Sequence, residues 1–116
     1  MTKTDLETML ASYIETALWS STDDEQNPLD GLGLDLLKAT EREFRNDCKA
    51  FGEQNESHIN GQWSRAGHDF WLTRNGHGAG FWDGDWPEAA GEALTKASKA
   101  FGSVDLYVYR GKVRAS

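Results

Sequence analysis

Residues 68–86, HDFWLTRNGHGAGFWDGDW, hold most of the side chains in this sequence whose types could carry out chemistry. His68, Asp69 and Asp83 are residue types that bind zinc or iron and that move protons in hydrolases. His77 is of the same type, but in an extended strand pair it would lie on the order of 20 Å from His68, whereas metal–nitrogen distances are about 2 Å. The spacing therefore disfavours a metal site, and no metal or other cofactor is expected.

Nucleophilic and phosphate-binding signatures are also weak. The sequence has no Gly-x-Ser-x-Gly elbow, and GHGAG lacks both the dinucleotide fingerprint and a Walker lysine. Cys48, the single cysteine, falls on the apolar stripe of a predicted helix, which is typical of a buried structural thiol. We therefore expect a protein that is not an enzyme. A small metal-dependent hydrolase or nuclease using His68, Asp69 and Asp83 stays open as an alternative.

The dipeptide Asn75–Gly76 stands between two aromatic-rich runs, which predicts a β-hairpin with a two-residue turn. That register places three pairs of residues opposite one another: Phe70 and Phe81, Trp71 and Gly80, and His68 and Asp83. Aromatic side chains then occupy both faces of the hairpin, and only one face can be the inner one. The other face is either covered by a loop or presented to a partner.

The candidate partner-binding residues come from two places in the sequence. Trp71, Arg74, His77 and Trp82 belong to the predicted hairpin, where aromatic and polar side chains of this kind are typical of protein interfaces. The acidic cluster Asp23, Asp24 and Glu25 lies in a loop rich in Ser, Asp, Asn and Gly. Solvated loop charge and a surface for a basic partner are both consistent with that cluster.

Hydrophobic periodicity predicts three helices. The first begins at a capping box formed by Thr4 and Glu7 and ends near Trp19. The second spans about 35–51 and stops at Gly52, and the third spans about 85–101 with Asp85 as N-cap. Residues 53–66 are predicted to be irregular, with Ile59 and Trp63 holding them against the core.

Residues 104–109 alternate apolar and polar side chains, which predicts a half-buried strand, and Arg110–Gly111 predicts a turn into a short last segment. The whole chain of 116 residues fits one α+β domain in the order α–α–β–β–α–β. Its antiparallel sheet of three to four strands, the aromatic hairpin plus the C-terminal strand, is packed by about three helices. The domain divides into an acidic helical half, 1–60, and a hairpin–helix–strand half, 61–116.

The net charge of −7 is unevenly distributed along the chain. Residues 1–60 hold 13 acidic and 5 basic residues, a net of −8, and residues 61–116 hold 6 and 7, a net of +1. Nucleic-acid-binding proteins are usually basic, so this charge argues against direct nucleic-acid binding. An acidic surface is consistent with a protein partner that has a basic surface and equally with a charge that only keeps the protein in solution. The sequence leaves the oligomeric state open.

Location can also be predicted from composition. The sequence has no run of about 18 apolar residues and no basic region followed by an apolar core at its start, so neither a membrane span nor a secretory signal is expected. A single cysteine fits a reducing compartment. We therefore expect a cytoplasmic protein without a membrane partner.

Three segments, ALWSSTDDEQNPLD, AGHDFWLTRNGHGAGFWDG and AFGSVDLYV, together resemble an uncharacterised family of small acidic proteins encoded by bacteriophages, prophages and plasmids. The resemblance covers most of the chain, and it carries over no catalytic residues. It implies an accessory protein of a mobile element that binds and disables a host factor, such as restriction or CRISPR machinery. A further alternative is a module for single-stranded nucleic acid that uses the aromatic hairpin, Arg65, Arg74 and the basic end YRGKVR.

Overall fold

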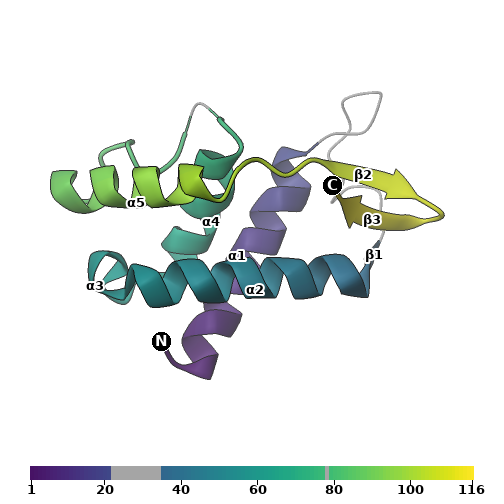
Figure 1. Cartoon of the computed structure of the whole chain (residues 1–116), viewed down its shortest axis with the longest axis horizontal. Helices are drawn as coiled ribbons and strands as arrows, with labels where there is room; N and C mark the ends of the chain where they lie inside the picture. Colours follow the sequence, from purple (N-terminus) through teal and green to yellow (C-terminus); the bar gives the residue numbers. More distant parts are fainter. Residues whose placement is uncertain (22–34, 78) are drawn as a thin grey trace.

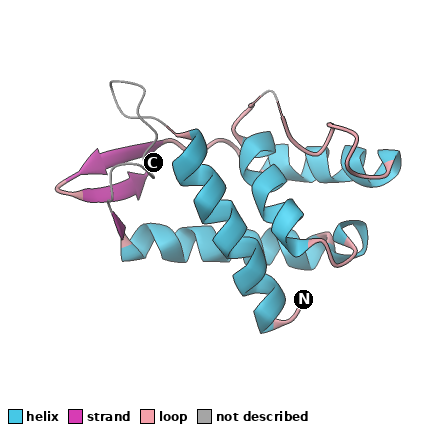
Figure 2. Cartoon of the chain, turned by 180° about the vertical axis from the view of Figure 1, so that it is seen from behind, coloured by secondary structure: helices cyan, strands magenta, loops and turns pink. Residues whose placement is uncertain are grey.

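The computed structural model describes residues 1–21, 35–77 and 79–116, which form two layers of helices with a small sheet at one end (Figure 1). Helices α2 (Lys38–Gln54) and α5 (Glu88–Ala100) make one layer. Helices α1 (Lys3–Ser20) and α4 (Trp63–Arg74) make the other layer and lie side by side, as Figure 2 shows from behind. The short helix α3 (Glu56–Ile59) follows α2. None of the described helices is long and apolar enough to cross a membrane.

The sheet has three short strands, β1 (Asp35–Leu36), β2 (Leu106–Tyr109) and β3 (Lys112–Ala115), in the order β1–β3–β2. β2 and β3 pair antiparallel, whereas β1 pairs parallel to β3, so the sheet is mixed. The α+β class is confirmed. The predicted order α–α–β–β–α–β is wrong, because the order of the described elements is α–β–α–α–α–α–β–β. The sheet has three described strands, as predicted, but it is antiparallel only between β2 and β3, and the described residues form five helices where about three were predicted.

The predicted aromatic hairpin is also wrong, and helix α4 occupies its first half. Nine of the twelve residues of α4 are buried, and residues 69–74 are buried without a break, so the second half of this helix is enclosed on nearly all sides. The dipeptide that predicted the turn instead ends this helix. The N–H of Gly76 donates to the carbonyl of Thr73, and the N–H of His77 donates to that of Leu72. With Gly76 at φ +70°, these two bonds form a Schellman motif.

Two helix starts also differ from the sequence prediction. The capping box of α1 consists of Thr2 and Asp5, whose side chains each accept the other's backbone N–H at 3.0 and 2.9 Å, so Thr4 and Glu7 do not form it. Helix α5 has Pro87 as N-cap, and Asp85 lies outside the helix. The predicted end of α1 near residue 19 and of α5 near residue 101 are confirmed within two residues.

Helix α2 begins three residues later and ends three residues later than predicted, and Gly52 lies inside it. A side chain at Gly52 would collide with the Met1 sulfur at 2.7 Å, so the glycine serves close packing and does not end the helix. The segment 53–66, predicted to be irregular, contains α3 and the start of α4. Ile59 and Trp63 are buried there, as expected.

Aromatic side chains from three helices, α1, α2 and α4, form most of the core. Phe51 of α2 stacks on Phe70 of α4 with ring centroids 4.1 Å apart, and Tyr13 of α1 meets Trp71 of α4 edge to face at 5.4 Å. Phe101, which follows α5, packs edge on against Phe70. The aromatic residues of the predicted hairpin are therefore used mainly to join the helices to one another.

Helices α1 and α4 approach most closely at Gly67. A Cβ atom built on Gly67 would lie 2.2 Å from the carbonyl oxygen of Met9, far inside van der Waals contact. Only glycine allows the two backbones to pack at this distance. Gly67 thus fixes the position of α4, and with it the side chains that α4 contributes to the surface.

Candidate functional site

A groove of about 970 Å³ runs between α1, the start of α4 and the segment 83–85. From α1 it is lined by residues at steps of three and four along one helix face: Asp5, Thr8, Ser12, Glu15, Thr16 and Trp19. Its other wall consists of Gly61, Gln62, Trp63, Ser64, Arg65, His68, Asp69, Asp83 and Asp85. One face of helix α1 therefore packs on the core, and the opposite face lines this groove.

Negative charge dominates the groove. Of the described residues, five that line it carry carboxylates, and the only basic side chains among them are Arg65 and His68. The guanidinium of Arg65 already donates one hydrogen bond, to the backbone carbonyl of Asp85 at 3.3 Å. A groove with this lining attracts cationic groups and repels phosphates.

Asp69 is the buried acid at the base of the groove, with 5% of its surface exposed. One of its oxygens accepts a hydrogen bond from the indole nitrogen of Trp86 at 2.7 Å. The other lies 2.9 Å from Nδ1 of His68, whose side chain is about half exposed. Asp69 thus anchors the segment 80–86 to α4 and orients the imidazole at the groove surface.

The three residues of the hydrolase alternative all line this groove, but they do not converge. Asp83 accepts a hydrogen bond from the backbone N–H of Gly80 at 3.0 Å, and the predicted pairing of His68 with Asp83 is replaced by that of His68 with Asp69. Within residues 1–21, 35–77 and 79–116, no three His, Cys, Asp or Glu side chains are placed to hold a metal ion.

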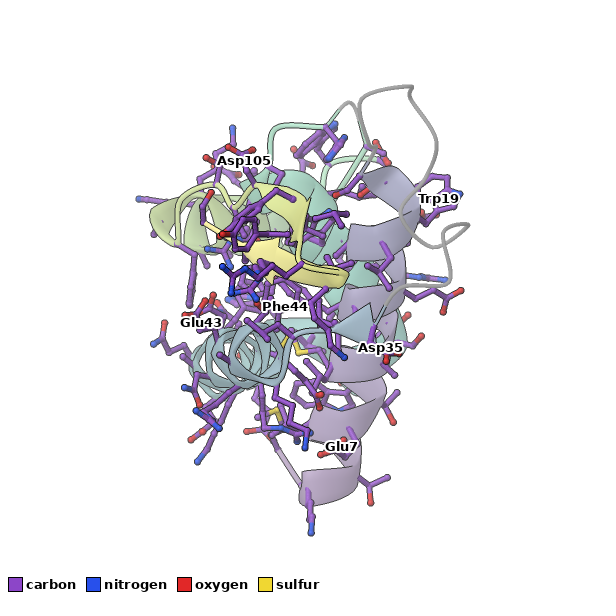
Figure 3. The ribbon with its side chains drawn as sticks, turned by 90° about the vertical axis from the view of Figure 1, so that its right-hand side faces the viewer. Glu7, Trp19, Asp35, Glu43, Phe44 and Asp105 are labelled. Atoms are coloured by element: carbon purple, nitrogen blue, oxygen red, sulfur yellow. The ribbon has the colours of Figure 1, made fainter. Side chains whose placement is uncertain are left out.

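Two tryptophan side chains, Trp19 and Trp82, are exposed on the surface of the protein, and each lines a groove. Trp19, at the end of α1, is 59% exposed, and Figure 3 shows it pointing away from the helices. Trp82 is 46% exposed and lines a second groove of about 650 Å³ between the segment 81–86 and α5. Exposed aromatic side chains of this size are frequent anchors of protein interfaces.

The structure separates the residues that the sequence grouped as partner-binding. Trp71 is 1% exposed, and its indole nitrogen donates to the Ser20 hydroxyl at 2.8 Å, so it belongs to the core. His77 is half-buried and Trp82 is exposed. The acidic cluster Asp23, Asp24 and Glu25 lies outside the described residues.

Arg74 is the second predicted contact residue that the structure buries, at 7% exposure. Its guanidinium donates to four oxygens within 3.0 Å: the Tyr13 hydroxyl, the Asp47 carboxylate and the backbone carbonyls of Phe101 and Gly102. Burial alone would lower the Arg74 pKa, but Tyr13 and Asp47 raise it above its ordinary value. Arg74 therefore binds the end of α5 to α1, α2 and α4.

Cys48 is fully buried, which confirms the prediction of a structural thiol. Burial raises its pKa far above the ordinary value, so it stays a neutral thiol at physiological pH. A neutral, buried thiol is neither a nucleophile nor a metal ligand.

Sequence reasoning missed the α1 face of the groove. Glu15 and Trp19 stand opposite the apolar stripe of α1, at a helical step of four residues. The helical pitch would have placed them together on one exposed face. Asp85 was missed as well, because it was interpreted as a helix cap.

Comparisons with protein-family models, curated proteins and solved structures found no match for this chain.

Proposed function

We propose that this chain is a non-enzymatic accessory protein of a phage or another mobile element, and that it binds a host protein with a basic surface. The observation that carries the proposal is the acid-lined groove with the exposed Trp19 at its edge. A groove of this kind offers a partner both charge complementarity and an aromatic anchor.

The partner side chains that fit the groove are lysines and arginines. Glu15, Asp83 and Asp85 lie on its two walls, so a basic segment between them would meet carboxylates from both sides. Trp19 adds a ring over which a cation or the apolar stem of a lysine can lie. The acidic loop residues Asp23, Asp24 and Glu25 follow Trp19 in the chain and belong to the same proposal.

The sharper form of the proposal is that the host target handles nucleic acid. Such enzymes carry basic surfaces that neutralise phosphates, and an acidic protein can occupy these surfaces in place of the nucleic acid. Counter-defence against restriction or CRISPR machinery is one outcome of that occupation. The resemblance to small acidic proteins of phages and plasmids supports this context.

The test is an affinity capture of host proteins with four forms of the purified chain. The wild type is compared with Trp19→Ala and Glu15→Arg, which alter the groove, and with Glu43→Arg, which makes the same charge change on α2. Figure 3 shows Glu43 on the side of the molecule away from Trp19. Circular dichroism of each form checks that the variants are folded.

We expect one stoichiometric host protein that is captured by the wild type and Glu43→Arg but lost with Trp19→Ala and Glu15→Arg. Its binding should weaken as salt rises, because exposed charges are screened over about 8 Å at physiological ionic strength. Equal capture by all four forms would contradict the groove as the binding site. Hydrolysis of nucleic acid by the purified chain, abolished in His68→Ala, would contradict the non-enzymatic part of the proposal and favour the hydrolase alternative.

A further inference from the structure

The β2–β3 ribbon carries aromatic and basic side chains on its outer face. Tyr107 pairs with Arg114 across the ladder, and Tyr109 pairs with Lys112, so these four side chains share one face. Together with Arg110 in the turn, they are called the aromatic–basic face below. Figure 1 shows the ribbon projecting beyond the helices at one end of the molecule.

The exposed tyrosines are not required for packing of the ribbon. The opposite face of the ribbon supplies its contacts with the core through Leu106 and Val113, and Val113 is fully buried. Along β2 the exposure alternates, and Tyr107 and Tyr109 are 45% and 52% exposed. The ribbon thus holds two aromatic rings in water on a backbone fixed by the core.

The charge of the ribbon is opposite to that of the chain. Residues 105–116 contain three basic residues and one acidic residue, Asp105, a net of +2, whereas the whole chain has a net charge of −7. The guanidinium carbons of Arg110 and Arg114 lie 5.3 and 5.2 Å from the ring centroid of Tyr109. Among the residues that the structure describes, only Lys112 of these cations has a carboxylate within 4.0 Å, that of Asp35 at 3.5 Å.

We propose that the aromatic–basic face binds single-stranded nucleic acid. Same-face residues of a strand repeat about every 7 Å, so the rings and guanidinium planes form adjacent platforms for unpaired bases. The three cations lie beside these platforms, where they can contact phosphates. An acidic peptide would use the cations but would leave the exposed ring of Tyr107 without a stacking partner.

The acidity of the rest of the molecule does not prevent this binding. At physiological salt, charges are screened over about 8 Å, so only carboxylates close to the ribbon oppose this binding strongly. Among the described residues, two exposed carboxylates lie beside the ribbon: Asp35, which is 84% exposed and pairs with Lys112, and Asp105, which directly precedes β2. Exposed ion pairs such as Asp35–Lys112 contribute little. This surface differs from the groove, and the proposal does not depend on the proposed host partner.

The experiment measures fluorescence anisotropy of labelled DNA and RNA single strands of about eight nucleotides, each mixed with the full chain. A labelled duplex and an oligoglutamate peptide serve as comparison ligands. The variants are Tyr107→Ala, Tyr107→Phe, Arg114→Ala and Asp35→Asn, and Lys96→Ala on α5 is the matched control for loss of one positive charge.

We expect Tyr107→Ala to weaken single-strand binding at least about fivefold through lost stacking, whereas Tyr107→Phe and Lys96→Ala bind like the wild type. With three phosphate contacts, the logarithm of the affinity should fall against the logarithm of salt with a slope of about −2, and with about −1.4 in Arg114→Ala. Asp35→Asn should change the affinity by less than about twofold, because the exposed pair of Asp35 with Lys112 contributes little.

Three results would overturn the proposal. The first is no detectable binding to either single strand at about 50 mM salt. The second is binding to oligoglutamate as tight as to the single strands and unaffected by Tyr107→Ala, which would identify a plain site for acidic peptides. The third is self-association of the chain in sedimentation velocity that Tyr107→Ala abolishes, which would assign the face to a second copy. Preference for DNA or RNA identifies the source of the strand.

Discussion

Replacing Arg74 distinguishes a structural arginine from a contact residue more sharply than any other substitution in this chain. In Arg74→Ala, the carbonyls of Phe101 and Gly102 and the hydroxyl of Tyr13 lose their donor inside the protein. The buried Tyr13 hydroxyl left without this partner costs about 2 kcal/mol, and each of the two partly buried carbonyls adds about 0.5 kcal/mol, which sums to about 3 kcal/mol. The Asp47 carboxylate adds little because its side chain is 35% exposed and retains contact with water.

A loss of about 3 kcal/mol is large against the stability of about 5–15 kcal/mol that is typical of a domain. At about 4 °C per kcal/mol for a chain of this size, the thermal midpoint should fall by about 12 °C. Circular dichroism during heating and urea titration at 25 °C measure both quantities. The thermal midpoint of Arg74→Lys should lie between those of the wild type and Arg74→Ala, because one ammonium group cannot donate to four acceptors that are placed around a planar guanidinium.

The matched control is Arg45→Ala, which removes an arginine that pairs with Glu7 and Glu41 on the surface. Its midpoint should stay close to that of the wild type, because exposed ion pairs contribute little. If Arg74→Ala is as stable as Arg45→Ala and yet loses the captured host protein, the structural argument is refuted. The prediction from sequence, in which Arg74 touches a partner, would then be correct.

Gly67→Ala should lower the free energy of unfolding by about 1–3 kcal/mol in urea titration, because the new methyl group would collide with the Met9 carbonyl oxygen. The control Ser64→Ala, at an exposed position of the same helix, should change it by less than about 0.5 kcal/mol. Equal urea midpoints for the two variants would contradict the close approach of α1 and α4. Stability should fall as pH rises above about 9 to 10, because burial raises the pKa values of Cys48 and Tyr13 above their ordinary 9.0 and 10.0 and the unfolded chain then releases protons that the folded chain keeps. The slope should approach about −1.4 kcal/mol per pH unit for each group and should be shallower in Cys48→Ala and in Tyr13→Phe, so an unchanged slope in both would count against it. Cys48 should react with a thiol reagent at pH 8 only after urea unfolds the chain, and rapid labelling of the native protein would show that the thiol is accessible.

Helices with a clear apolar stripe were predictable from sequence. The stripe of α1, the end of α5 at Gly102 and the alternation of β2 each follow one local period, and the structure reproduces them. Cys48 was correctly predicted as buried for the same reason. Such features depend on the periodicity of a short segment, which sequence displays directly.

The aromatic stretch was not predictable by the same means. Asn75–Gly76 is compatible with both a hairpin turn and a helix end, since each requires a positive φ at the glycine. Tertiary packing decides between them: Trp63, Phe70 and Trp71 are all buried on α4 against other helices. The strand propensity of aromatic residues is weak beside the burial of such large side chains.

The candidate site was predicted only in part. The sequence pointed to His68, Asp69 and Asp83, and all three line the groove. It could not show that Asp69 faces Trp86, because that contact depends on how the segment 80–86 folds back on α4. Arg74 illustrates the same limit. The sequence around a single arginine does not show whether its side chain is buried in a hydrogen-bond network or exposed at the surface.

The packing of α1 on α4 also has a consequence for how the chain folds. The hydrogen bond of Trp71 to Ser20 and that of Arg74 to Tyr13 join residues 51 and 61 positions apart. Helices α2 and α3 lie between the two partners in sequence, so a long loop must close before this interface gains its contacts. Chains dominated by such distant contacts fold more slowly than bundles of sequential helices. We therefore expect the interface of α1 with α4 to form after the individual helices, because its contacts require this loop to close.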